Sequence, residues 1–148
     1  MCGISGQFSL NGELIPDLEI CLQCQSHLIA HRGPDGKGIW ISNKKHLGFA
    51  HRRLAVIDIS ESARQPMIGE NGTVITFNGE IYNYRELRND LRDSWDFRTG
   101  SDTECILAAY QKYGINCVDK LRGMFAFAIW DPKNNRLFCA RDRFGIKP

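Results

Sequence analysis

The order of strand-like and helix-like segments constrains the fold of this 148-residue chain more than any other feature of its sequence. Hydrophobic periodicity and turn residues predict strands at 3–10, 38–42, 46–52, 73–77, 124–131 and 136–141, and helices at 16–31, 84–91 and 101–113. Strands and helices do not alternate in the regular way of parallel α/β proteins. The order therefore predicts an α+β fold in which largely antiparallel sheets are covered by helices. The length indicates one domain, residues 1–148.

The composition argues against several classes of protein. Charged residues make up 24% of the chain and the formal net charge is +2, so we expect no nucleic-acid or membrane partner. The apolar runs are much shorter than the roughly 20 residues of a membrane-spanning helix. The start, Met1-Cys2-Gly3, lacks the basic and apolar regions of a signal peptide, which predicts a cytoplasmic location.

Six cysteines without secretory features predict free thiols in a reducing compartment. Cys21 and Cys24, followed by His27 and His31, have a spacing that suggests a metal site. All four fall on one predicted helix, and one straight helix cannot surround a zinc ion tetrahedrally. We therefore expect no metal site, and interpret Cys21 as part of the apolar face of helix 16–31.

Cys2 differs from the other cysteines because removal of Met1 would make it the N-terminal residue. Its thiol would then lie beside a free α-amino group, which titrates at about pH 7.7–8.0 in model compounds. A nucleophile and a base matched to neutral pH would thus belong to one residue. Two other interpretations remain open: a small residue in an apolar strand, or a thiol activated by His31 or His51.

Asn78-Gly79 follows an apolar strand and is the strongest tight-turn signal in the chain. The Asn78 carboxamide and a backbone N–H at such a turn could form an oxyanion hole, whose donors are worth about 2.7–4 kcal/mol each. The simpler interpretation is that the pair only turns the chain.

Charged residues near the ends of predicted elements are candidates for substrate binding. The guanidinium of Arg53 could bind a carboxylate through two parallel hydrogen bonds, and Arg52 has the same claim. Asp102 and Glu80 could bind an ammonium group. Each of these residues also has a simpler interpretation. The two arginines would be solvated charges at a strand end, Asp102 would be a carboxylate at a helix N-terminus, and Glu80 would be a turn residue.

Taken together, the motifs resemble class II glutamine amidotransferase domains, the N-terminal-nucleophile type, and in particular the N-terminal domain of glutamine-hydrolysing asparagine synthetases. The matching stretches, in family order, are Met1-Cys2-Gly3-Ile4, His31-Arg32-Gly33-Pro34-Asp35, Arg53-Leu54-Ala55-Val56-Ile57-Asp58, Gln65-Pro66, Phe77-Asn78-Gly79-Glu80-Ile81-Tyr82-Asn83, Gly100-Ser101-Asp102, Gly123-Met124-Phe125-Ala126-Phe127 and Arg141-Asp142. The resemblance implies a four-layer αββα sandwich.

The resemblance also implies a role for each candidate residue. Cys2 attacks the side-chain amide of glutamine, and Asn78 and Gly79 stabilise the oxyanion. Arg53 holds the substrate carboxylate, and Asp102 and Glu80 hold its ammonium group. The segment that lines the pocket is Leu54, Ala55, Val56 and Ile57. The domain itself needs no cofactor or metal.

In this family the amidotransferase domain continues past the position of Pro148, and an ATP- and magnesium-dependent synthetase domain follows. We therefore expect a sandwich that is incomplete at its C-terminal end, with its synthetase domain absent. The implied function is to release ammonia for the amidation of aspartate. Relatives with this pattern also modify sugars, peptides or antibiotics, and a non-catalytic remnant is a further alternative. A homodimer is compatible with the pattern.

Overall fold

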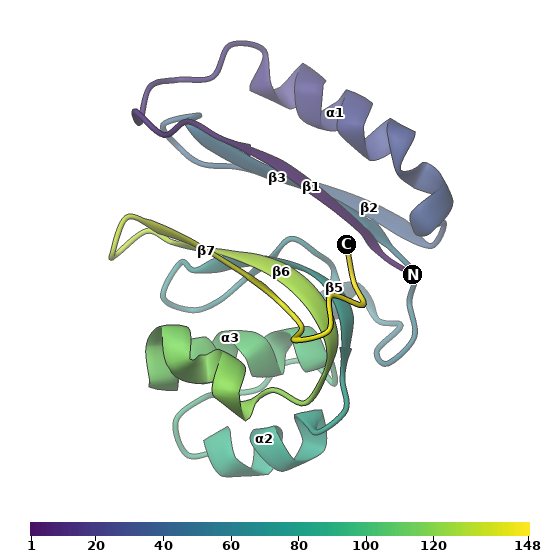
Figure 1. Cartoon of the computed structure of the whole chain (residues 1–148), viewed down its shortest axis with the longest axis vertical. Helices are drawn as coiled ribbons and strands as arrows, with labels where there is room; N and C mark the ends of the chain where they lie inside the picture. The colour runs from purple at the N-terminus through teal and green to yellow at the C-terminus, as the bar shows by residue number, and fades with distance from the viewer.

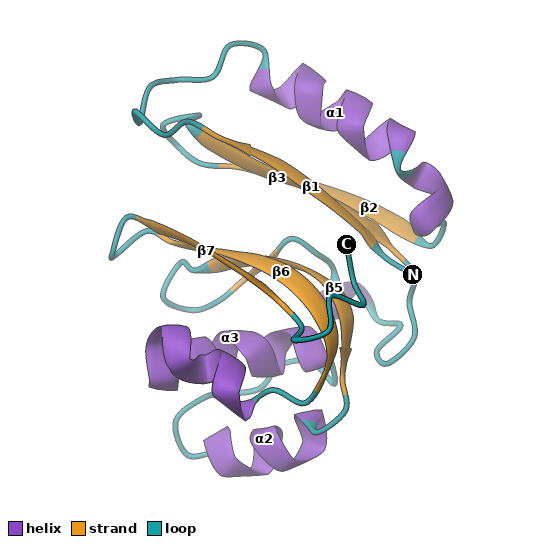
Figure 2. Cartoon of the chain, in the orientation of Figure 1, coloured by secondary structure: helices purple, strands orange, loops and turns teal.

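Two antiparallel sheets are stacked face to face, and helices cover the outer face of each (Figures 1 and 2). This arrangement is seen in a computed structural model, which describes all residues, 1–148. Layers of helix, sheet, sheet and helix follow one another from the top of Figure 2 to its bottom. The four-layer αββα architecture expected from the sequence is thereby confirmed.

The first sheet contains the N-terminal strands. In spatial order they are β1 (Gly3–Phe8), β3 (Leu47–Arg53) and β2 (Gly36–Ile41), all antiparallel. Helix α1 (Leu18–Leu28) packs on its outer face, and a short 3-10 turn, η1 (Ala30–Arg32), follows it. The helix predicted at 16–31 is longer than α1, whose last residue, Leu28, is 74% exposed.

The second sheet contains the later strands and carries most of the helices. Its order is β4 (Met67–Ile68), β5 (Val74–Ile81), β6 (Gly123–Asp131) and β7 (Arg136–Arg141). The outer face is covered by α2 (Tyr84–Leu91), α3 (Asp102–Tyr113) and η3 (Gly114–Lys120), and η2 (Glu61–Ala63) lies in the connection before β4.

Side chains of β3 alternate between the two faces of the first sheet, as in any strand. Leu47 and Phe49 point inwards and pack against Val74 and Trp130 of the second sheet. Ala50 points outwards and packs under α1. Because of this alternation, neighbouring residues of β3 belong to different layers.

The largest apolar cluster lies between the second sheet and its helices, where 17 buried residues pack together. Ile75, Phe77 and Ile81 of β5 all contribute to it. The intervening residues of β5 therefore face the first sheet, and Asn78 is one of them.

The structure corrects one local prediction. Asn78-Gly79 makes no turn, because β5 continues through both residues to Ile81.

Ser101 caps α3 by accepting a hydrogen bond from the N–H of Thr103. The side chain of Glu104, three residues further on, makes no reciprocal bond to Ser101. Its carboxylate instead accepts hydrogen bonds from the preceding loop, which include the indole N–H of Trp95.

Gly79 is required by the close approach of β5 to β6. A Cβ at this position would lie 2.2 Å from the carbonyl oxygen of Met124 and 2.7 Å from Cα of Phe125. We predict that Gly79→Ala lowers the free energy of unfolding by about 2–3 kcal/mol, because the strands must move apart. Urea denaturation measures this change.

A matched control for this substitution is Gly36→Ala, also in a strand. A Cβ on Gly36 meets its nearest atom, Cβ of Arg53, at 3.6 Å, an ordinary contact distance. We expect a change within about 1 kcal/mol in this variant. Equal effects of the two substitutions would contradict the proposed role of Gly79.

Candidate functional site

A cavity of about 130 Å³ lies at the end of the sandwich where β1 begins. The residues predicted from the sequence that line it are Cys2, Arg53, Leu54, Val56, Ile57, Asn78, Gly79, Glu80 and Asp102. Ala55 is the one predicted residue outside the lining, and its N–H donates a hydrogen bond to the carboxylate of Asp35 at 2.9 Å. The fold thus gathers side chains from both sheets and from α3 around one space.

Cys2 lies immediately before β1 and is half-buried. Its Sγ accepts a hydrogen bond from the N–H of Leu54 at 3.3 Å and lies 3.6 Å from the Leu54 carbonyl oxygen, to which the thiol donates. These contacts hold the sulfur against the loop that follows β3. Met1 also lines the cavity.

The edge of β5 next to the cavity carries backbone donors. β4 pairs only with the start of β5, so the rest of this edge has no neighbouring strand. Along it, the N–H of Phe77 donates to Oε1 of Gln65 at 2.7 Å, and the N–H of Ile81 donates to Oδ2 of Asp102 at 3.0 Å. Successive N–H groups of a strand alternate between its two edges, so the N–H of Gly79 points to this same edge.

Asn78 faces the first sheet, and only 2% of its surface is exposed. Its Oδ1 is buried without a hydrogen-bond partner. Buried side-chain amides normally make hydrogen bonds, so an amide oxygen without a partner in a side chain that lines a cavity indicates a place for a polar ligand. Asn78 and Gly79 thus provide an amide side chain and a backbone N–H at adjacent positions.

Arg52 and Arg53, of which the family resemblance selects Arg53 for the substrate carboxylate, point to opposite faces of β3. Nε of Arg52 donates to the carbonyl of Ser26 in α1 at 2.8 Å. The guanidinium of Arg53 lines the cavity and donates to the carbonyls of Asp58 and Ser60, the latter at 2.9 Å. Only Arg53 is therefore placed to meet a ligand in the cavity.

Asp102 supplies a carboxylate that burial makes costly to ionise. It lies at the start of α3 and is 6% exposed. Loss of hydration, helped by the nearby charge of Glu80, raises the pKa of Asp102 to about 6 against the opposing effect of backbone hydrogen bonds. A cation bound in the cavity would offset this cost.

Neither histidine considered as a base lines the cavity. His31 is exposed in η1. His51 is fully buried between the sheets, where Nδ1 lies 3.1 Å from Oγ1 of Thr76. Burial, together with the charge of Arg53, lowers the pKa of His51 to about 3, so its imidazole is neutral and weakly basic.

Several lining residues were not selected from the sequence, among them Gln65, Thr103, Met124 and Lys147. Gln65 bridges two elements, because it accepts from Phe77 and donates to Oγ1 of Thr103 at 3.2 Å. Gln65-Pro66 was among the stretches that matched the family, and this was the only signal for its place in the site.

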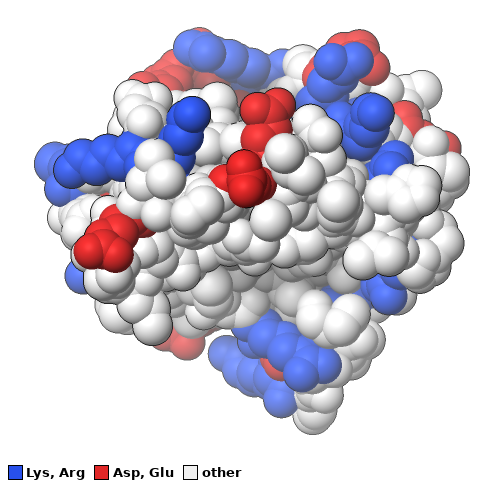
Figure 3. Space-filling view, turned by 90° about the horizontal axis from the view of Figure 1, so that it is seen from above, with Lys and Arg blue, Asp and Glu red and all other residues white.

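On the face that Figure 3 shows, neither sign of charge dominates. The face above α1 shows separate groups of acidic and basic side chains between uncharged areas (Figure 3). No group of three or more metal-ligating side chains is clustered in the structure. No helix has both the length and the apolarity needed to cross a membrane.

Comparison with known proteins identifies the family. The model of the glutamine amidotransferase domain family matches residues 1–148. The chain belongs to this family. The chain spans about a quarter of the length of two relatives that it matches. It is 43% identical over its whole length to asparagine synthetase 3 from Bacillus subtilis, of which it covers 24%. It is 41% identical over 99% of its length to the amidase chry2 of Gibberella zeae, of which it covers 23%.

The same fold occurs in a solved amidotransferase of lower sequence similarity. Glutamine phosphoribosylpyrophosphate amidotransferase from B. subtilis, solved with ADP and GMP, superimposes with a TM-score of 0.79 and 20% identity. The alignment covers this whole amidotransferase domain and 38% of that chain. At this identity the likeness supports the fold alone.

The raised pKa of Asp102 predicts a pH-dependent stability. The folded protein binds this proton more tightly than the unfolded chain, so the free energy of unfolding falls as pH rises from about 4 to about 6. Asp102→Asn removes the charge, and we expect it to gain about 3 kcal/mol relative to the unsubstituted protein between pH 4 and pH 8. Urea denaturation at both pH values measures this.

The exposed Asp96 offers a matched control for this experiment. Asp96→Asn is expected to change the unfolding free energy by less than about 0.5 kcal/mol at either pH. A difference between Asp102→Asn and the unsubstituted protein that stays constant with pH would contradict the assignment.

Proposed function

We propose that this domain hydrolyses glutamine to glutamate and ammonia, with Cys2 as the nucleophile. The observation that carries the proposal is the convergence of Cys2, Asn78 and Gly79 on one cavity that Arg53 and Asp102 also line. An acyl-transfer site needs a nucleophile, oxyanion donors and groups that orient the substrate, and residues suited to each role lie around this cavity.

In the proposed reaction, the Cys2 thiolate attacks the carbonyl carbon of the glutamine side-chain amide. The carbonyl π electrons move to oxygen, and this oxyanion accepts hydrogen bonds from the Asn78 carboxamide and the Gly79 N–H. When the oxyanion collapses, the C–N bond breaks and the α-ammonium group of Cys2 gives its proton to the leaving amine. Water, deprotonated by the α-amino group, then hydrolyses the thioester and releases glutamate.

The charges of the cavity match a zwitterionic amino acid. Arg53 lies on the β3 side, where its guanidinium can bind a carboxylate. Asp102 and Glu80 lie on the opposite side, where their carboxylates can bind the α-ammonium group. Val56 and Ile57, from the loop after β3, supply apolar surface for the methylene groups of the substrate.

The ammonia is proposed to serve an asparagine synthetase-type reaction, the amidation of aspartate. Support comes from asparagine synthetases that are 43% and 46% identical to this chain over its full length. ATP and magnesium chemistry would belong to a separate C-terminal synthetase domain. A second candidate is a different acceptor for the ammonia, which the 41% identity to an amidase favours.

The proposed location is the cytoplasm, because six free cysteines suit a reducing compartment.

Blocking the α-amino group tests the proposed base. Protein with Met1 removed, verified by intact mass, should release glutamate, whereas protein with an acetylated Cys2 should be at least about 100-fold slower, because the proton acceptor is lost. Coupled glutamate and ammonia assays measure both rates. A non-catalytic remnant would release no glutamate in either form and would leave Cys2 unlabelled by a diazo-ketone analogue of glutamine.

Two cysteine variants complete this test. Cys2→Ser should lose glutamine hydrolysis, while Cys24→Ser, which changes an exposed thiol on α1, should keep it. Undiminished hydrolysis after acetylation of Cys2 would rule out the α-amino group as the base.

Arg53 and Arg52 form a matched pair for the substrate carboxylate, since they are adjacent and face opposite layers. We predict that Arg53→Gln raises the KM for glutamine roughly 30- to 100-fold, the equivalent of about 2–3 kcal/mol for a lost charged hydrogen bond. Arg52→Gln should leave KM within about threefold. Steady-state kinetics measure both, and equal KM values would remove Arg53 from the substrate site.

A further inference from the structure

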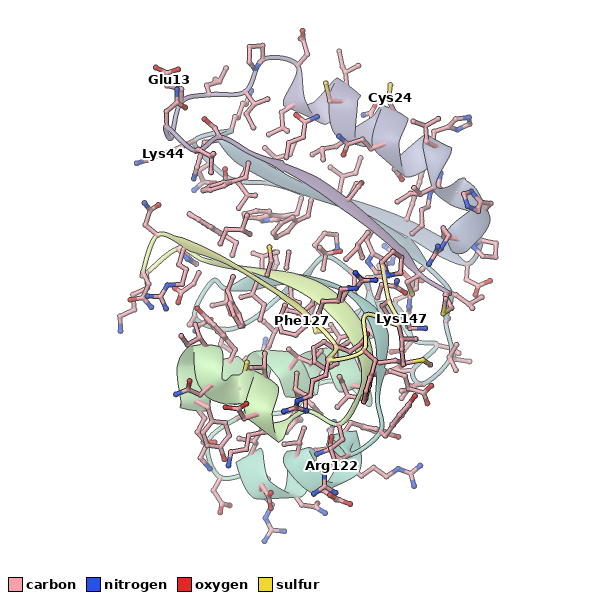
Figure 4. All side chains as sticks on the ribbon, viewed as in Figure 1. Glu13, Cys24, Lys44, Arg122, Phe127 and Lys147 are labelled. Atoms are coloured by element: carbon pink, nitrogen blue, oxygen red, sulfur yellow. The ribbon has the colours of Figure 1, made fainter.

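Lys147 is a buried lysine whose side chain lines the candidate cavity. It is 2% exposed and shares the cavity wall with Met1 and Cys2. Figure 4 shows it at the end of the sandwich near the two chain termini, whereas Lys44 lies at the opposite end. No role has yet been given to this cation.

Backbone hydrogen bonds hold Lys147 in place from two sides. The carboxylate of Asp142 accepts from the N–H of Lys147 at 3.1 Å and from the N–H of Phe125 in β6, also at 3.1 Å. The guanidinium of Arg141 donates to the carbonyls of Lys147 and Gly145. The turn that carries Lys147 is thus tied to the second sheet.

The ammonium group of Lys147 has no carboxylate partner. None of the four ion pairs in the structure includes it. The only polar contact of Nζ is Sδ of Met1, and a thioether is a weak acceptor. A buried charge without a counter-charge is expensive, so a purely structural role would be better served by an apolar side chain.

The contact with Met1 gives the position of this charge relative to the N-terminus. Removal of Met1 takes away the thioether and creates a free α-amino group on Cys2. The ammonium of Lys147 then remains in the same cavity as the new amine and the thiol. A positive charge within about 4–6 Å favours a neutral amine over an ammonium and a thiolate over a thiol.

We propose that Lys147 is a positioning residue of the glutaminase site. Its charge keeps the amine of Cys2 neutral near neutral pH and favours transfer of the thiol proton to that amine, which forms the attacking thiolate and the α-ammonium group that later protonates the leaving amine. This inference rests on the proposed function of the same cavity. Lys147 acts through Cys2 and takes part in no bond that forms or breaks.

The carboxyl groups of the cavity act in the direction opposite to Lys147. Asp58 from the loop, Glu80 from β5 and Asp102 from α3 are carboxyl groups, which favour the ammonium and the thiol. Arg53 from β3 is the only other cation, and it is engaged by the carbonyls of the loop after β3. Lys147 is therefore the cation that can oppose the carboxylates at the N-terminus.

The test is the pH dependence of Cys2 alkylation in protein with Met1 removed. Iodoacetamide is the probe, and mass spectrometry of the N-terminal peptide separates Cys2 from the other thiols. In a plot of the alkylation rate of Cys2 against pH, we expect Lys147→Gln to shift the rising limb towards higher pH by about one pH unit. Lys147→Arg keeps the charge and should keep the limb, as should the control Lys44→Gln at an exposed turn.

Three outcomes would overturn the proposal. One is an unchanged limb in Lys147→Gln. Another is a raised KM for glutamine without any shift of the limb, which would make Lys147 a substrate ligand. Thermal denaturation is measured for each variant, and Lys147→Met replaces Lys147→Gln if the latter is unfolded. If both neutral variants are unfolded, Lys147 has a structural role and the proposal is wrong.

Alkylation needs no glutamine, so this experiment can fail or succeed independently of the glutaminase proposal. If the rising limb depends on Lys147 but the protein releases no glutamate, the electrostatic role of Lys147 stands and the proposed hydrolysis of glutamine is wrong. If the protein hydrolyses glutamine but the rising limb is the same in Lys147→Gln, the proposed function stands and the electrostatic role of Lys147 is wrong.

Discussion

Face-to-face packing of two antiparallel sheets is the constraint on which the site depends. Leu47 and Phe49 contact Val74 and Trp130, and this contact fixes β3 opposite β5. Further along the same strands, at the end of the sandwich, the inward-facing residues become polar and the sheets enclose the cavity. Any change in strand register by one residue would exchange Arg53 for Arg52 and turn the cavity side chains to the opposite faces.

Electrostatics inside the cavity depend on burial as much as on charge. Asp102 is costly to ionise because α3 and β5 remove its water, and a ligand cation would compensate. Lys147 is buried without a carboxylate partner, close to the residue that precedes Cys2. Arg53 and Asp102 give the cavity charges of opposite sign, which suits a zwitterionic ligand because each end of the ligand can bind one of them.

Much of this fold could be predicted from hydrophobic periodicity. The helices α2 and α3 and the hairpin of β6 and β7 lie where their patterns indicate, because local spacing and capping determine them. Asn78-Gly79 was misjudged because a turn dipeptide also suits a strand in which a neighbouring backbone leaves no room for a Cβ. The short strand β4 and the bridging role of Gln65 give no periodic signal, since both depend on contacts distant in sequence.

The motifs and the order of the predicted elements were enough to indicate the family, the layered class of the fold and the residue suited to nucleophilic attack. Family membership follows from motifs along the whole chain, and the match over residues 1–148 confirms it. The folded structure shows why Arg53 and not Arg52 reaches the cavity, places His31 and His51 outside it, and brings Lys147 beside Met1. The physical reason is that motifs specify which groups are present, whereas sheet packing specifies which of them share a desolvated space.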